Sequence, residues 1–213
     1  MIVVQGFGPF GSHSVNPSEL SVRALAERAE ADVHAVVLPT SLEAARREIP
    51  ELVARHRPSG WIGVGLAAGR AALSVEAVAV NLAAWGGAYA DADGTVAQRQ
   101  PVVEGGPDAY LTTFPVDQLL GSFTAAGIPA YLSLSAGSYL CNASMYIAAH
   151  TAALNGLRCQ TGFIHLPQFP ELVSDPEKEP SMAATAVSQA LELTIAAIRK
   201  DAGAGGLYTR RNA

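Results

Sequence analysis

The sequence contains little cysteine and little charge. Only 2 of its 213 residues are cysteines, Cys141 and Cys159, which excludes a disulfide framework. Free thiols suit a reducing compartment, and we expect a cytoplasmic protein. The chain has 14 lysines and arginines against 19 acidic residues, and no basic run. This balance argues against a nucleic-acid partner.

Long uninterrupted apolar runs are also missing. The most apolar region, residues 71–90, is broken by Glu76, Asn81 and the pair Gly86-Gly87, whereas a membrane-spanning helix needs about 20 nearly uninterrupted apolar residues. The opening MIVVQGFGPF lacks the basic start and long apolar stretch of a secretory signal. We therefore expect buried sheet at 71–90 and no membrane partner.

Apolar β-branched runs instead alternate with helical patterns, and 49% of the residues are hydrophobic. The patterns predict strands at 2–5, 33–38, 60–65, 73–81, 130–135 and 162–166. They predict helices at about 16–29, 41–56, 115–126, 141–154 and 180–200. This alternation is typical of a three-layer α/β/α fold with an open, twisted and mostly parallel sheet.

Three further features concern the organisation of the chain. The short connection between the strands at 60–65 and 73–81 suits a hairpin, so we expect a mixed sheet. Residues 85–112 are rich in Gly, Asp and Pro and predict a long loop of functional importance or high mobility. We expect residues 1–213 to form a single domain with a frayed tail from about residue 202.

A glycine-rich motif follows the first predicted strand. Residues 6–11, GFGPFG, match the G-x-G-x-x-G pattern of dinucleotide-binding proteins. In that fold the third glycine lies within the helix and an acidic residue ends the second strand. Here the helix pattern starts only at Asn16, and no acidic residue ends the second strand. We reject the nucleotide site and interpret the motif as a turn that presents Phe7 and Phe10; an ordinary core role for both rings is an equal alternative.

Cys141 stands where a strand and a short turn, SLSAGSYL, meet a predicted helix. The unpaired amides and the dipole of a helix N-terminus favour anions, and the anionic thiolate is the nucleophilic form of cysteine. The same amides can hold an oxyanion. The alternative is a small buried hydrophobic residue, which is the role we expect for Cys159. A serine hydrolase using Ser135 is a weaker hypothesis, because serine replaces the first glycine of the G-x-S-x-G elbow.

A thiolate nucleophile needs a base, and His165 is the candidate. It ends the predicted strand TGFIH, and ligands of open α/β sheets bind at such strand ends. Glu76 lies in the apolar strand LSVEAVAVN, where an unpaired carboxylate is costly. A hydrogen bond between the two would stabilise Glu76 and fix the tautomer of His165. A structural histidine and an edge-strand carboxylate are the alternatives, and His13 in the glycine-rich turn could also lie near a site.

Four segments together resemble the type I pyroglutamyl peptidases, also called pyrrolidone carboxyl peptidases, a family of cysteine peptidases. GFGPFGSHSVNPS is similar to the opening motif of the family, and GLAAGRAALSVEAVAVN to its glutamate segment. SLSAGSYLCNASMY is similar to the nucleophile segment and GFIHLP to the histidine segment. The four segments occur in the order of the family and span nearly the whole chain.

The resemblance implies removal of an N-terminal pyroglutamyl group from peptides through a thioester acyl-enzyme. Cys141 would be the nucleophile, His165 the base and Glu76 the carboxylate of this triad, with no metal or cofactor. The resemblance also implies that six residues bind substrate: Phe7, Phe10, Asn16, Leu66, Tyr139 and Leu140. It further implies a homotetramer or another homo-oligomer.

The sequence departs from the family pattern at three positions. One is Gln168, which stands where members carry a tyrosine after the H-x-P of the histidine segment. Ala77 follows the glutamate where members carry arginine, and Gly86 stands about where the arginine of the D-A-R-I-P-D-N segment lies. Arg70 and Arg99 are the candidates to replace that arginine. Because this arginine is missing, a catalytically weak pyroglutamate-binding relative is the alternative function.

Overall fold

The computed structural model describes residues 1–11, 14–86 and 90–200. The predicted frayed tail and His13 lie outside the described residues.

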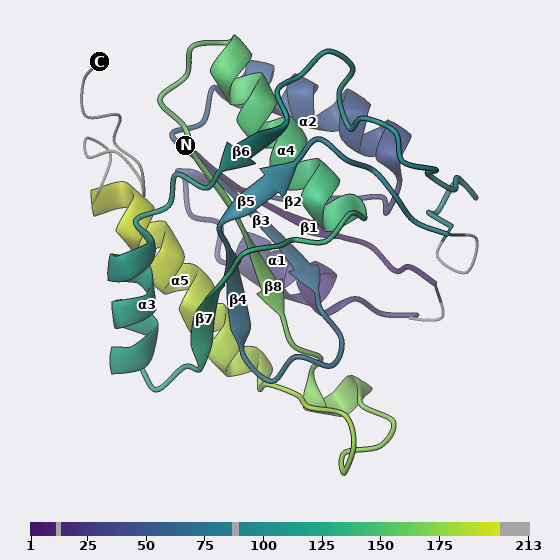
Figure 1. Ribbon diagram of the computed structural model, residues 1–213. Coiled ribbons are helices and arrows are strands. Elements are labelled where there is room, and N and C mark those ends of the chain that lie inside the picture. The colour runs from purple at the N-terminus through teal and green to yellow at the C-terminus, as the bar shows by residue number, and fades with distance from the viewer. Residues whose placement is uncertain (12–13, 87–89, 201–213) are drawn as a thin grey trace.

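A six-stranded sheet forms the middle layer of the molecule (Figure 1). In spatial order its strands are β2 (Val33–Leu38), β1 (Ile2–Phe7), β3 (Gly60–Leu66), β8 (Gln160–Leu166), β4 (Leu73–Glu76) and β7 (Ala130–Ser133). Neighbouring strands run parallel except for β4 and β8, which are antiparallel. The prediction of a mixed, mostly parallel sheet is therefore confirmed.

Helices cover both faces of this sheet (Figure 1). One face packs against α2 (Leu42–His56) and α4 (Leu140–Leu154). The other packs against α1 (Pro17–Glu27), α3 (Val116–Ala125) and α5 (Ala184–Lys200), and a short 3-10 helix, η2, spans Pro170–Leu172. Each face has its own apolar core because successive side chains of a strand point to opposite faces. Ile62 thus packs with the α1, α3 and α5 side, and its neighbour Trp61 packs with the α2 and α4 side.

Local signals in the sequence account for the helix ends. Asn16 caps α1 by accepting a hydrogen bond from the backbone N–H of Ser18, at 3.0 Å, and a proline follows at the first helical position. Ser41 caps α2 in the same way by accepting from Ala44, also at 3.0 Å. The helix α2 continues past Pro50 to its end at His56.

The expected hairpin between the third and fourth strands is wrong. β8 lies between β3 and β4, so the two strands do not pair. The predicted strand at 73–81 also divides at Ala77, whose N–H donates to the Ser133 carbonyl while its own carbonyl accepts from Thr112. Beyond Ala77 the chain continues as β5 (Val78–Val80), which pairs with β6 (Ala109–Leu111) in a separate two-stranded sheet.

The predicted loop at 85–112 contains β6, and its described part is tied to the rest of the fold. The backbone N–H of Ala92 donates to the carbonyl of Thr40 at 2.7 Å. The Asp91 carboxylate accepts from the backbone N–H of Leu42, at 3.0 Å, at the start of α2. These bonds hold the segment across the N-terminal end of α2, beside the end of β1.

Candidate active site

Cys141 occupies the first turn of α4. The cap residue Tyr139 has extended backbone and provides no side-chain hydrogen bond to the helix. The first amides of a helix have no carbonyl partner within the helix, so they and the helix dipole favour negative charge at this position. The next residue, Asn142, fixes the start of α4 by donating to the carbonyls of Val80 (2.9 Å) and Leu82 (3.1 Å). This role of Asn142 was not predicted from the sequence, although the Cys-Asn pair belongs to the motif.

The thiol of Cys141 fills a gap left by a glycine in the sheet. A Cβ atom placed on Gly65 would lie only 2.7 Å from the Cys141 Sγ and 2.9 Å from the ring of Phe163. Gly65 pairs in register with His165 on the neighbouring strand. The absent side chain therefore brings the sulfur down to the sheet, next to the imidazole.

His165 lies near the end of β8 and is 5% exposed. Its Nδ1 is 2.7 Å from Oε1 of Glu76, so the predicted hydrogen bond is present in the structure. Burial lowers the pKa of His165, but the charge of Cys141 and hydrogen bonds to Cys141 and Glu76 outweigh it and raise the pKa to about 9. Because Nδ1 faces Glu76, Nε2 is the nitrogen available to the thiol.

Glu76 ends β4 with no exposed surface. In the antiparallel pairing of β4 with β8, Glu76 stands opposite Phe163 and therefore diagonal to His165 on the same face. Burial by itself raises the pKa of Glu76, but the hydrogen bond and charge of His165 lead the interactions that lower it overall. The buried carboxylate thus remains ionised and accepts a hydrogen bond from the Nδ1–H of His165.

A cavity of about 150 Å³ opens onto this cluster. Its lining comes from the ends of β1, β3 and β8, the start of α2 and the start of α4, and consists of Phe7, Phe10, Thr40, Gly65, Leu66, Ala136, Tyr139, Leu140, Cys141 and His165. Five of the six predicted substrate-binding residues are in this lining. The sixth, Asn16, lies behind it and donates to the carbonyl of Gly8 at 2.9 Å. Thr40, which sequence analysis missed as a lining residue, donates to the same carbonyl at 3.0 Å.

Aromatic rings form one side of the cavity. The Tyr139 ring contacts Trp85 edge-on, with centroids 4.9 Å apart, and its centroid is 6.3 Å from that of Phe10. Burial, together with the charges of Asp91 and Cys141, raises the pKa of Tyr139 to about 12, so its phenol stays neutral. Trp85 gave no signal in the sequence because its ring packs against a residue more than fifty positions away.

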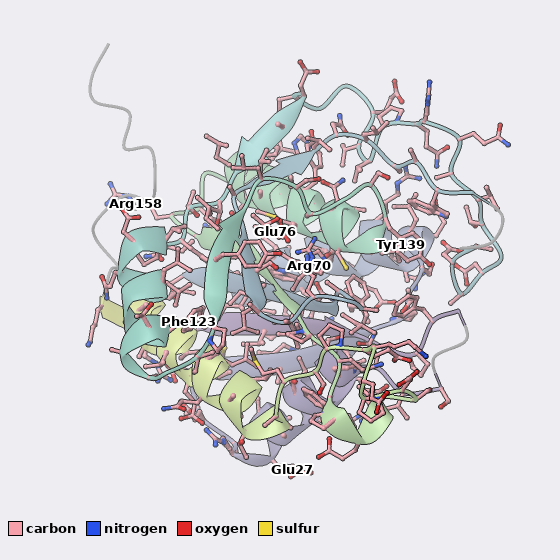
Figure 2. All side chains as sticks on the ribbon, turned by 60° about the horizontal axis from the view of Figure 1, so that its bottom comes forward. Glu27, Arg70, Glu76, Phe123, Tyr139 and Arg158 are labelled. Atoms are coloured by element: carbon pink, nitrogen blue, oxygen red, sulfur yellow. The ribbon has the colours of Figure 1, made fainter. Side chains whose placement is uncertain are left out.

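The two arginines that could replace the missing family arginine differ in their contacts. Gly86, which stands at the family position, is exposed, and Arg99 is exposed as well. Arg70 donates from Nη1 to Oε1 of Glu76 at 2.9 Å, and Figure 2 shows the two labelled residues side by side at the centre of the molecule. Arg70 is therefore connected to the buried carboxylate, but it comes from the β3–β4 turn and not from the family position.

Other candidate nucleophiles and bases are engaged elsewhere. Ser135 is exposed, and its hydroxyl accepts from the backbone N–H of Gly137 at 3.2 Å. His150 is hydrogen bonded to Tyr110 at 2.9 Å. Burial raises the pKa of Cys159 to about 12, which keeps that thiol protonated and unreactive at neutral pH. Within residues 1–11, 14–86 and 90–200, no group of three or more His, Cys, Asp or Glu side chains is placed to hold a metal ion.

Comparison with known proteins assigns this arrangement to a family. A family model described as pyroglutamyl peptidase matches residues 1–201 of the chain. The chain belongs to the pyroglutamyl peptidase family. It is 37% identical over 201 residues to a pyrrolidone-carboxylate peptidase of Thermococcus kodakarensis, with 94% of this chain and 96% of the relative covered. A pyrrolidone-carboxylate peptidase 1 of Ralstonia nicotianae is 37% identical over 91% of this chain and 90% of its own.

Solved structures agree with this assignment. A pyrrolidone carboxyl peptidase from the hyperthermophile Pyrococcus furiosus superposes with a TM-score of 0.89 at 34% identity, covering 94% of this chain and 99% of that one. An E192A variant of the same enzyme gives a TM-score of 0.88. The pyroglutamyl peptidase family is a family of cysteine-type hydrolases, and this chain is an enzyme of that class.

Proposed function

We propose that this pyroglutamyl peptidase family member removes the pyroglutamyl residue from the N-terminus of peptides, with Cys141, His165 and Glu76 as its catalytic residues. The observation that carries the proposal is a small apolar cavity with a thiol and a buried imidazole in its lining, the imidazole being hydrogen bonded to a fully buried carboxylate. Such an arrangement can activate a thiol for attack on an uncharged acyl group.

The chemistry follows from the geometry. His165 takes the proton of Cys141 at Nε2, and the thiolate attacks the carbonyl carbon of the pyroglutamyl residue. The carbonyl oxygen becomes an oxyanion, which the backbone N–H groups at the start of α4 stabilise. His165 then gives its proton to the leaving amine, and a thioester to Cys141 remains. Water, deprotonated by His165, hydrolyses the thioester and restores the thiol.

The cavity suits a flat, uncharged ring. Phe7, Phe10 and Tyr139 supply apolar and aromatic surface, and a blocked lactam carries no ammonium group that would have to be desolvated. Leu140 closes the cavity beside the thiol, and the backbone near Leu66 provides hydrogen-bonding groups at the end of β3. Asn16 contributes indirectly, because its bond to Gly8 holds the turn that carries the two phenylalanines.

A comparison of two fluorogenic substrates tests the function. We expect the enzyme to release aminomethylcoumarin from the pyroglutamyl derivative and to leave the prolyl derivative intact. The two rings have the same size, but prolyl carries a charged ring nitrogen and lacks the lactam carbonyl. Binding of free pyroglutamate without turnover of the pyroglutamyl derivative would instead support a catalytically weak binding protein. Hydrolysis of the prolyl derivative at an equal rate would contradict the proposed specificity.

Replacement of Gly65 by alanine is expected to reduce kcat/KM at least tenfold. The added Cβ would lie 2.7 Å from the Cys141 Sγ, so the thiol must move away from His165, and small displacements of reacting groups can cost about 100-fold in rate. The measurement is kcat/KM on the pyroglutamyl substrate.

Gly121→Ala is the matched control for this change. Gly121 lies within α3, and a Cβ there meets no atom within 4 Å. Alanine is the better helix former by about 0.5–1 kcal/mol, so this variant should melt slightly higher and keep full activity. Wild-type activity in Gly65→Ala would show that the sulfur position does not matter.

We also propose that the protein assembles with copies of itself. β7 is the edge strand of the main sheet, and its sequence and the residues after it carry no charge or proline to discourage pairing. Tyr131, Leu132 and Leu134 are 43%, 37% and 76% exposed in the single chain. Sedimentation of the protein gives the mass in solution, and a monomer at all concentrations would contradict this proposal.

We propose a single catalytic domain, because the apolar cores on the two sides share one sheet. We propose a cytoplasmic location, because Cys141 and Cys159 are free and the mechanism requires a reduced thiol.

In the part of the chain that the structure describes, no helix is both long and apolar enough to cross a lipid bilayer.

A further inference from the structure

Arg70 reaches from a tight turn into the buried cluster. The turn between β3 and β4 closes with a hydrogen bond from the backbone N–H of Arg70 to Ala67, at 3.2 Å, and Gly69 adopts a left-handed φ of +84° within it. From there the guanidinium extends to Glu76, while 31% of the Arg70 side chain stays exposed to solvent. A partly hydrated cation thus meets a carboxylate that has no exposed surface.

One oxygen of Glu76 receives both donors. Oε1 lies 2.7 Å from Nδ1 of His165 and 2.9 Å from Nη1 of Arg70. The two bonds fix the carboxylate oxygen from two directions, so it cannot turn away from the imidazole without losing the guanidinium as well. Charge-assisted hydrogen bonds of this kind are about twice as strong as neutral ones. They hold in place the Glu76 oxygen that accepts the hydrogen bond from His165.

The charges in this cluster alternate in sign. In the active state Cys141 is negative, His165 positive, Glu76 negative and Arg70 positive. Arg70 favours the ionised form of Glu76 and offsets part of the negative potential that Glu76 exerts on the imidazole and the thiol. Part of the Arg70 side chain stays in water, so this stabilisation does not require complete desolvation of a second charge.

We propose that Arg70 is a positioning residue of the active site, which acts through Glu76 and holds that carboxylate ionised and fixed against His165. The inference rests on the proposed roles of Cys141, His165 and Glu76. Arg70 is not among the described residues that line the cavity, so its role is separate from substrate binding. Arg70 supplies a positive charge in place of the family arginine, but it contacts the Glu76 carboxylate and does not line the cavity.

The pH dependence of Cys141 reactivity distinguishes this role from a structural one. The groups that face Glu76 are His165 on β8, Arg70 on the turn and Ser133 on β7, with Cys141 beyond His165 on α4. Without Arg70, an ionised Glu76 disfavours the thiolate more strongly. If Glu76 instead becomes protonated, it no longer stabilises the positively charged imidazole of His165 that pairs with the Cys141 thiolate. Both effects move the onset of thiolate reactivity to higher pH.

The experiment measures alkylation of Cys141 by iodoacetamide as a function of pH, with the modified peptide quantified by mass spectrometry. We expect Arg70→Met to shift the acid limb of the rate profile upward by about 0.5–1 pH unit, a range that allows for solvent screening of the exposed guanidinium. Arg70→Gln retains a donor but no charge and should give a similar shift. Arg70→Lys retains the charge and should stay close to wild type.

With the pyroglutamyl substrate, Arg70→Met should lower kcat and leave KM unchanged.

Arg47→Met is the matched control. Arg47 is an exposed arginine on α2 that pairs with its neighbour Glu48 at 2.8 Å. Its removal changes the net charge equally and should leave the profile unmoved. An unshifted acid limb in both Arg70→Met and Arg70→Gln, or an equal shift in Arg47→Met, would overturn the proposal. The alkylation assay needs no peptide, so a failure of the proposed peptidase activity would appear separately, as wild-type protein that reacts with iodoacetamide but does not turn over the pyroglutamyl substrate.

Discussion

Replacing Cys141 by serine is expected to reduce kcat/KM for a pyroglutamyl substrate by about 10⁴-fold or more. A serine hydroxyl keeps the hydrogen-bonding geometry next to His165, but it is far less acidic than a thiol and a weaker nucleophile. The fold should survive, because the side chain at this position becomes smaller and fits the gap over Gly65. Steady-state kinetics and a thermal melt of the same preparation make the measurement.

Cys159→Ser is the matched control for Cys141→Ser. Burial raises the pKa of the Cys159 thiol to about 12, so that thiol takes no part in chemistry at neutral pH. Its replacement should leave kcat/KM within about twofold of wild type and affect only stability, as expected for a half-buried group away from the site. Activity retained in Cys141→Ser, or lost equally in Cys159→Ser, would contradict the assignment of Cys141.

Replacing Glu76 by glutamine is expected to lower kcat by about 10² to 10⁴-fold with little change in KM. The amide oxygen can still accept from His165 and from Arg70, so the hydrogen bonds survive and only the charge is lost. Without that charge the imidazolium is no longer stabilised, and the imidazole is a weaker base toward Cys141. Arg70 also loses its counter-ion. Steady-state kinetics at several pH values make the measurement.

Glu43→Gln is the control for Glu76→Gln. Glu43 pairs with Arg46 at 3.1 Å on the surface of α2, with 70% of its side chain exposed. Exposed pairs contribute about 0–1 kcal/mol, so this variant should behave as wild type in the kinetic assay. If Glu76→Gln kept full activity at neutral pH, Glu76 would serve only to orient the imidazole, and its charge would play no part in the reaction.

The layers of the fold could be predicted because each depends on local pattern. An apolar β-branched run predicted the strand at Val33–Leu38, and a helical pattern predicted the helix at Leu42–His56, with its start set by the cap residue Ser41. Pairing between strands depends on contacts distant in sequence. The insertion of β8 between β3 and β4, which removed the expected hairpin, has no local signal. The same applies to the switch of sheets at Ala77.

The candidate site divides in the same way. Cys141, His165 and Glu76 could be identified because each is chemically unusual for its local setting: a thiol at a helix start, an imidazole at a strand end and a carboxylate in an apolar strand. Arg70 and Trp85 have no such local peculiarity, and the sequence alone singled out Arg70 only as one of two candidate replacement arginines. Their importance comes from what they meet in space, a buried carboxylate in one case and the ring of Tyr139 in the other.

The most direct test of the account combines turnover with selective alkylation of the wild-type enzyme. Aliquots are treated with increasing iodoacetamide, assayed on the pyroglutamyl substrate and mapped by mass spectrometry at both cysteines. The account predicts that activity falls in proportion to modification of Cys141, reaching zero when one equivalent has reacted while Cys159 is still unmodified. Undiminished turnover by enzyme fully alkylated at Cys141 would contradict the account.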